Sequence, residues 1–259
     1  MSRLCRDGGA NGVTTAEARV VALRNAGMQV SRERIGGAAG AVYDHVRKEL
    51  GDATASAEAC LRACERVAAM LDQAFAEALH GGTPVACEPG CAYCCHLRVG
   101  AFEHEAVALA HYLRTRLEPA RAAAVRERIL ANAGRIERMT VAEHYRARLP
   151  CALLVDGRCC AYEVRPSACA AHHSLSRVRC AQAFEHPERH GTPANSRPAS
   201  LELQTLGDAL IAATQSALTD SGRSAARGEL HQLLRAILTN GDTADEPTRQ
   251  GAPQCERST

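Results

Sequence analysis

Tryptophan is absent from this chain, and aromatic residues of all kinds make up only 3% of it. Apolar residues nevertheless reach 46%, so Ala, Leu and Val must fill the core, which favours packed helices over a β-sandwich. Lysine is nearly absent as well, because Lys48 is the only one and arginine replaces it elsewhere, as GC-rich coding favours. The net charge of +2 argues against a generally basic nucleic-acid binder.

Long apolar runs are also lacking. No stretch approaches the ~18 consecutive apolar residues of a membrane span. The first residues, MSRLCRDGGANG, contain no apolar segment of the kind that a signal peptide needs. We therefore expect a cytoplasmic protein that has neither a membrane nor nucleic acid as a partner, in a compartment where clustered thiols bind metal or do redox work more often than they form disulfides.

Apolar residues recur at three- and four-residue steps through most of the chain, as they do in amphipathic helices. A capping box at Thr14 and Glu17 opens the first predicted helix, and Gly36-Gly37 is expected to separate it from the second. The predicted helices cover about 14–27, 38–50, 54–79, 101–117, 119–139, 141–148, 200–219 and 223–238. The predicted organisation is a disordered N-terminus (1–13), N-terminal helices (14–82), a cysteine-cluster domain (83–185), a linker (186–199), C-terminal helices (200–240) and a disordered tail (241–259).

One segment has the pattern of a β-hairpin. Asp156-Gly157 lies between two short apolar runs within residues 153–162, and this dipeptide is typical of a two-residue hairpin turn. The expected fold class is therefore all-α, a helical bundle with a cysteine-rich metal-binding region and one short β-hairpin.

Cysteine is the residue in excess, with 13 in 259 residues. Cys91 and Cys94 have the C-x-x-C spacing that lets two thiolates reach one ion. Soft sulfur ligands suit zinc, copper(I) and iron–sulfur clusters. Eight clustered cysteines form the predicted ligand set: Cys87, Cys91, Cys94, Cys95, Cys151, Cys159, Cys169 and Cys180. They suffice for two four-thiolate sites, or for one cluster with spare thiols.

The other cysteines receive different interpretations. Cys60 and Cys64 lie one helical turn apart on an apolar stripe, so core packing is favoured. Cys160 alternates away from the hairpin face of Cys159 and is left out of the ligand set. Cys5 and Cys255 lie in the segments expected to be disordered and are interpreted as incidental.

The combined spacing C-x3-C-x2-C-C, followed by C-x-x-L-x2-G-x-C-x2-Y-x2-R-P-x2-C, resembles the zinc- or iron-chelating cysteine-cluster family (the CxxCxxCC domain, YkgJ type). The resemblance covers about residues 85–182. It rests on Cys87, Cys91, Cys94 and Cys95, then on Cys151, Leu154, Gly157, Cys159, Tyr162, Arg165, Pro166 and Cys169, with Cys180 where the family often has a further cysteine. Ala152 and Leu153 depart from the family's frequent Pro and Phe. The resemblance implies metal binding, by zinc or by iron.

Two classes of function follow. The first is a metal-binding protein that chelates zinc or iron through thiolates in structural or storage sites. The second is an iron–sulfur oxidoreductase or electron-transfer protein, for which His96, His172 and Glu105 are the nearby groups that could assist chemistry. His96, His172 and His173 also remain candidates to complete a mixed Cys/His site. Arg165 either bonds loop carbonyls or offsets thiolate charge. A metal ion is the expected partner, and a homodimer through the helices after residue 200 stays open.

Overall fold

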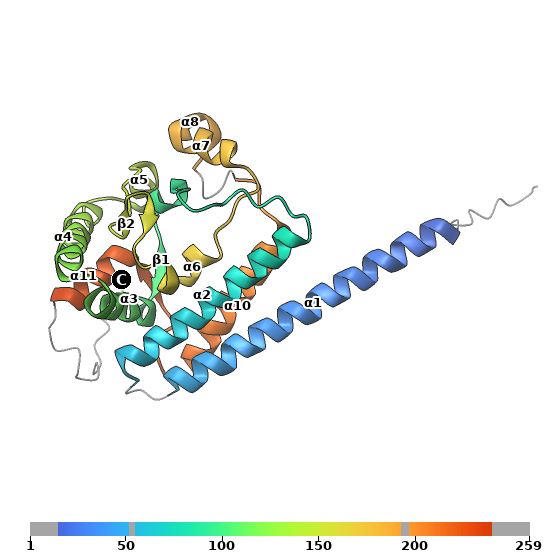
Figure 1. The fold of residues 1–259 in the computed structure, drawn as a ribbon, viewed down its shortest axis with the longest axis horizontal. Helices are drawn as coiled ribbons and strands as arrows, with labels where there is room; N and C mark the ends of the chain where they lie inside the picture. Colours follow the sequence, from blue (N-terminus) through green and yellow to red (C-terminus); the bar gives the residue numbers. More distant parts are fainter. Residues whose placement is uncertain (1–14, 52–54, 193–196, 240–259) are drawn as a thin grey trace, which may run out of the picture.

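The computed structural model describes residues 15–51, 55–192 and 197–239, and for residues 15–31 it describes the backbone alone. In these ranges the chain is all-α, with two small antiparallel sheets of two strands each (Figure 1). The predicted all-α class with a short hairpin is thus confirmed. The ends expected to be disordered, and with them Cys5, Thr14 and Cys255, lie outside the described residues.

Three long helices form one side of the molecule (Figure 1). Helix α1 (Thr15–Leu50) packs along α10 (Leu201–Asp220), and α2 (Ala57–His80) packs against both. The first part of α1 extends past the ends of the other two. Hydroxyl caps begin two of these helices, since Ser56 accepts the N–H of Ala59 and Ser200 accepts the N–H of Leu203.

The predicted break at Gly36-Gly37 is wrong, because α1 runs through both residues without interruption. Each glycine costs roughly 1 kcal/mol in a helix interior. The next two turns carry Val42, Val46 and Leu50, which are fully buried against the core. Their packing outweighs the local glycine preference, so burial and not propensity decides the length of this helix.

A second group of helices lies at the opposite side of the molecule. Helix α3 (Glu103–Arg116) and α4 (Pro119–Ile136) both pack against α11 (Leu230–Thr239). Pro119 takes the first position of α4, as predicted, and the Glu118 carboxylate accepts two backbone N–H groups there. Helix α4 ends a few residues before the expected Met139, and α5 (Val141–Arg146) follows.

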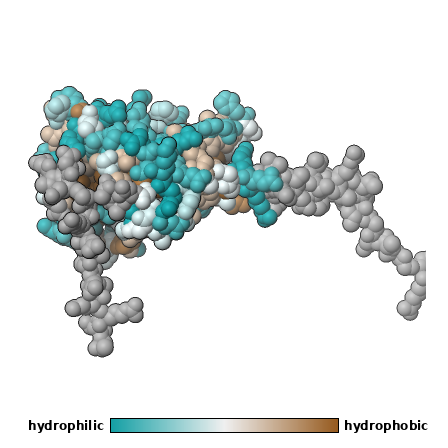
Figure 2. All heavy atoms as spheres, turned by 90° about the horizontal axis from the view of Figure 1, so that it is seen from below, coloured by the Kyte–Doolittle hydropathy of each residue, from teal (hydrophilic) through white to brown (hydrophobic). Residues whose placement is uncertain are grey.

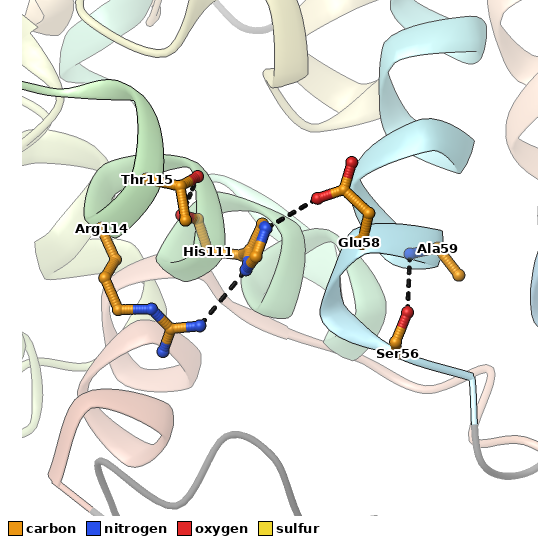
Figure 3. Close-up of polar contacts among 6 residues, drawn as sticks. All are labelled: Ser56, Glu58, Ala59, His111, Arg114 and Thr115. Carbon is orange, nitrogen blue, oxygen red and sulfur yellow. Dashed lines mark hydrogen bonds and ion pairs between the residues drawn. The ribbon is translucent and has the colours of Figure 1, made fainter.

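Polar contacts tie the two groups of helices together (Figure 3). His111 on α3 contacts Glu58 on α2 at 2.8 Å through Nε2 and accepts from Arg114 at 3.2 Å through Nδ1. Because Nδ1 accepts, the network assigns the proton to Nε2, which donates to the carboxylate. The contact is exposed, so its contribution to stability is small.

One sheet was not predicted at all. Strand β1 (Gly100–Phe102) pairs with β4 (Arg227–Glu229), and Phe102 is opposite Arg227. Residues 227–229 were assigned to a helix beginning near Arg223, whereas α11 begins at Leu230. The Glu229 carboxylate accepts the N–H of Gln232 and so caps the first turn of α11.

The cysteine-rich region lies between the two groups of helices. Its hairpin, β2 (Leu154–Val155) and β3 (Arg158–Cys159), turns at Asp156 and Gly157, which both have positive φ as a type I′ turn requires. This hairpin was predicted. The remaining elements are the 3₁₀ turns η1 (Tyr93–His96) and η2 (Tyr162–Val164), and the short helices α6 (Ser167–Ala170), α7 (Arg177–Glu185) and α8 (Pro187–His190). Helix α8 falls in the predicted linker, part of which (193–196) is not described.

A single apolar cluster joins α1, α2, α3, α4, α10 and α11. Cys60 and Cys64 are buried within it on α2, in agreement with the core-packing interpretation. The face seen in Figure 2 is mostly hydrophilic with small apolar patches. None of the described helices combines the length and apolar content that crossing a bilayer needs.

Candidate metal centre

The first cysteine group lies in the loop that follows α2. Gly82, with a φ of 86°, ends the helix, and the backbone N–H of Ala86 then bonds to the carbonyl oxygen of Ser174 at 2.8 Å. The N–H of Ser174 returns a bond to the sulfur of Cys87 at 3.3 Å. This ladder fixes the start of the loop against the segment between Cys169 and Cys180, so two cysteine-bearing segments far apart in sequence are in direct contact.

A second bond joins the two cysteine groups at their other end. The backbone N–H of Cys151 donates to the carbonyl oxygen of Cys95 at 2.7 Å. The N–H of Cys160 in turn bonds to the carbonyl of Leu153 at 2.8 Å, which closes the hairpin that carries Cys159. The chain between the groups, through α3, α4 and α5, therefore returns the second group to the first.

Seven of the eight predicted ligands line one cavity of about 800 Å³. They are Cys87, Cys91, Cys94, Cys95, Cys151, Cys159 and Cys169. Cys180 does not line this cavity and is buried on α7, close enough to raise the pKa of Cys91 together with Cys94. Cys160 also lies outside the lining, as the alternation of the hairpin predicted.

The buried thiols favour their protonated forms. Burial raises the pKa of Cys151 to about 11 and that of Cys159 to about 12. Burial also raises the pKa of Cys169 well above its ordinary range, and the nearby thiols of Cys151, Cys94 and Cys159 add to the rise. A contact with the Cys95 thiol is the chief cause of the raised pKa of Cys94. These couplings show that sulfurs of both groups are electrostatic neighbours.

Backbone N–H groups oppose these shifts at several cysteines. The N–H groups of Tyr93, Leu153 and Ala161 act against burial at Cys91, Cys151 and Cys159, each from two residues further along. A hydrogen bond of this kind favours the thiolate. The loops thus already present donors to the sulfur atoms that a metal would bind.

Four sulfurs around one ion lie roughly 3.8 Å apart, given metal–sulfur bonds of about 2.3 Å. Within 15–51, 55–192 and 197–239, no three His, Cys, Asp or Glu side chains are arranged to hold an ion in this way. Cysteine sulfurs are the ligands that soft metals prefer, and these sulfurs share one cavity. To bind an ion, they would have to move closer together.

The three candidate histidines differ in what their ring nitrogens do. His173 is buried, its Nδ1 contacts the carbonyl of Ala171, and its Nε2 accepts the N–H of Ser200, so both nitrogens are used. His96 contacts the carbonyl of Ala92 through Nδ1 and lies outside the lining. His172, like His173, lines the cavity, and burial lowers its pKa to about 3, which keeps the ring neutral as a metal ligand must be.

Glu105 has a structural position. Its buried carboxylate accepts the N–H of Phe102 at 2.8 Å and the N–H of Ser167 at 2.7 Å. It therefore caps α3 and the first turn of α6, the short helix that carries Cys169. Burial raises the pKa of this carboxyl, and the two backbone N–H groups act in the opposite direction. Glu105 holds Cys169 in place and is not among the residues that line the cavity.

Arg165 combines three contacts beside the cysteines. Its guanidinium bonds to both carboxylate oxygens of Asp72, at 3.2 and 2.5 Å, and donates to the carbonyl of Tyr162 at 2.8 Å. It also stacks on the Tyr162 ring, with its central carbon 3.8 Å from the ring centroid. The predicted loop-bonding role is thus present, and the group lines the cavity as well.

One buried pair was missed by the sequence reasoning. His231 contacts Glu229 at 3.0 Å through Nδ1 and accepts the N–H of Ala152 at 3.1 Å through Nε2. His231, Glu229 and Ala152 are all buried. The pair anchors the residue that follows Cys151 to the start of α11. The available signal was a Glu-x-His pattern inside an expected helix, which is weak without knowledge of strand β4.

No family model matches this chain, and neither the curated proteins nor the solved structures contain a significant match. The assignment of a function therefore depends on the chemistry of the cavity and on the cysteine spacing.

Proposed function

We propose that this protein binds zinc or iron through thiolates of Cys87, Cys91, Cys94, Cys95, Cys151, Cys159, Cys169 and Cys180. The observation that carries the proposal is the meeting of seven of these cysteines in one cavity, with Cys180 behind the first loop. All eleven cysteines in the described part of the chain are free thiols, so none of the eight is consumed by a disulfide. The cysteine-cluster resemblance supports the same chemistry.

Binding would close the site. The metal would replace protons on the thiols, and the resulting thiolates would converge on it, so the two groups would move closer together. For zinc, such binding is worth ~10–16 kcal/mol toward folding in small zinc domains. The shared core of the helices includes Leu153, Ala170 and Leu230, which also line the cavity, so closing the site would tighten this core as well. The backbone amides of the cysteine-rich region would then exchange their hydrogens with solvent more slowly.

Elemental analysis of the full chain, purified without oxygen or chelator, tests this proposal. We expect stoichiometric zinc or iron, and its loss when Cys94 and Cys151 are replaced by Ser. The matched control is Cys60→Ala, a buried thiol on α2 outside the cavity, which should keep the metal. Metal content near zero in the wild-type chain, or unchanged in the double variant, would contradict the proposal.

A second candidate is an iron–sulfur protein that transfers electrons. Two observations favour it. The number of thiols exceeds the four that one ion takes, and the backbone N–H of Ser174 bonds to the Cys87 sulfur, as N–H groups do around clusters whose potential is tuned by such bonds. A brown protein that absorbs near 400 nm and contains acid-labile sulfide would favour this candidate. A colourless protein with zinc would favour the first.

A further inference from the structure

The cavity is much larger than a metal site requires. Its volume of about 800 Å³ lies in the range of pockets that hold small organic molecules, roughly 300–1,000 Å³. This volume is that of the open cavity, before its sulfurs converge on a metal. Apolar side chains form much of the remaining wall, among them Phe75, Leu97, Val99 and Leu230.

The charged side chains of the lining are mostly of one sign. Four arginines line the cavity, namely Arg98, Arg158, Arg165 and Arg227, against one acid, Glu88. Glu88 pairs with Arg177 outside the lining, so it does not neutralise these arginines. While the thiols are protonated, this pocket with apolar walls and unbalanced positive charge favours an anion with an apolar body.

Two of the four arginines are already committed. Arg165 pairs with Asp72, and Arg227 donates to the carbonyl of Gly100 while it lies over the Phe102 ring. The side chains of Arg98 and Arg158, by contrast, have no hydrogen-bond or ion-pair partner among the described residues, although the backbone of Arg158 pairs with Val155 in the hairpin. Arg98 precedes β1 and Arg158 begins β3, so the two come from the first and the second cysteine group. Their guanidinium groups remain available to a ligand.

We propose that this cavity binds a small organic anion, of carboxylate, phosphate or sulfonate type, whose charged group is held by Arg98 and Arg158 and whose apolar body contacts the apolar wall. The anion lies beside the thiols without replacing them. The inference does not require a bound metal, because neither arginine is a metal ligand. It adds a ligand to the proposed metal site and so points to a protein that acts on, or responds to, an organic acid.

Equilibrium dialysis with two matched probes tests the inference. Naphthalene-2-sulfonate carries the negative charge, and naphthalene-2-sulfonamide has nearly the same shape without it. Using the full chain purified without oxygen, we expect the sulfonate to bind at least about tenfold more tightly, through charge-assisted hydrogen bonds. Raising the salt concentration should reduce this ratio.

The double variant Arg98→Gln/Arg158→Gln should lose about tenfold or more in sulfonate affinity and keep its sulfonamide affinity within about twofold. The matched control is Arg138→Gln, an exposed arginine outside the lining, which should change neither. Equal affinity for the two probes, no binding of the sulfonate, or an unchanged double variant would overturn the inference.

The metal content of the same samples separates this inference from the proposed function. The arginine variants should keep the metal, while the cysteine variants lose it. Anion binding by a metal-free chain would leave the inference standing and the metal proposal refuted. A metal-loaded chain without charge-selective binding would give the opposite result.

Discussion

The backbone N–H of Cys151 donates a 2.7 Å hydrogen bond to the carbonyl oxygen of Cys95. These two residues are the last of the first cysteine group and the first of the second. Their contact joins loops that more than fifty residues of helix and turn separate along the chain. It depends on the fold that brings α3, α4 and α11 together, and it makes the cysteine cavity a property of tertiary structure.

The buried pair of His231 and Glu229 should matter for stability. In His231→Ala the N–H of Ala152 loses its acceptor while it stays buried, which costs about 1–3 kcal/mol in the free energy of unfolding. His111→Ala is the matched control, because it removes a histidine–glutamate contact that is exposed (Figure 3) and should cost under about 1 kcal/mol. Urea unfolding measures both. Equal losses would mean that the buried pair does not anchor the Cys151 segment.

Arg165→Lys should destabilise the chain although the charge is kept. Lysine can neither bond to both Asp72 oxygens in a fork nor stack on Tyr162 as a planar guanidinium. We expect a loss of roughly 1–3 kcal/mol by urea unfolding, with Arg138→Lys as a neutral control. A fully stable Arg165→Lys variant would show that only the charge is needed here.

Alanine should stabilise α1 at the two glycines that were expected to break it. A Cβ at Gly36 or Gly37 would meet nothing within 4 Å, and both positions are helical and exposed. Each substitution should add roughly 0.5–1 kcal/mol to the free energy of unfolding. Gly207→Ala should do the opposite, since its Cβ would lie 2.6 Å from that of Ala171. A loss of stability in Gly36→Ala would argue against a continuous helix.

Stability of the metal-free chain should fall at high pH. The pKa values of Cys151 and Cys159 are raised from 9.0 to about 11 and about 12, so the folded state keeps protons that the unfolded state releases. This stabilisation is complete below about pH 9 and is lost as the pH rises through the folded pKa values, by at most about 1.4 kcal/mol per thiol per pH unit. Urea unfolding between pH 8 and 10.5 measures the loss. It should be smaller in Cys159→Ala, and a flat profile would refute the prediction.

Metal affinity should also depend on pH, but it should rise with pH where the stability of the metal-free chain falls. Binding requires thiolates, so each bound ion displaces protons from the buried thiols, and affinity should rise with pH across the neutral range. Proton release on adding zinc, measured in a weakly buffered solution, counts the thiols that bind. Release close to zero would mean that the added zinc does not bind to these cysteines.

Much of the fold followed from local patterns. The Asp156-Gly157 hairpin and the helix start at Pro119 were both predicted, because each depends on a few adjacent residues. The Gly36-Gly37 break was wrong, since the core packing of the turns beyond it decided the outcome. Strand β4 was missed because its partner β1 lies more than a hundred residues earlier, and three residues carry no strand pattern of their own.

In the candidate site, too, local patterns predicted some residues and missed those whose position depends on the tertiary fold. Spacing and resemblance selected the cysteines that line the cavity, and the pleat of the hairpin separated Cys159 from Cys160. Both His172 and His173 line the cavity, and spacing alone did not show that the nitrogens of His173 bond to Ala171 and Ser200. It also gave no reason to select Arg98, whose position in the lining depends on how the loop folds.

Metal content, measured together with the absorption spectrum, tests the central claim most directly. The full chain should be purified without oxygen or chelator and compared with the Cys94→Ser/Cys151→Ser variant. We predict stoichiometric zinc or iron in the first and its loss in the second, with Cys60→Ala unchanged. A folded wild-type chain that contains neither metal and takes up neither when they are added would contradict the account.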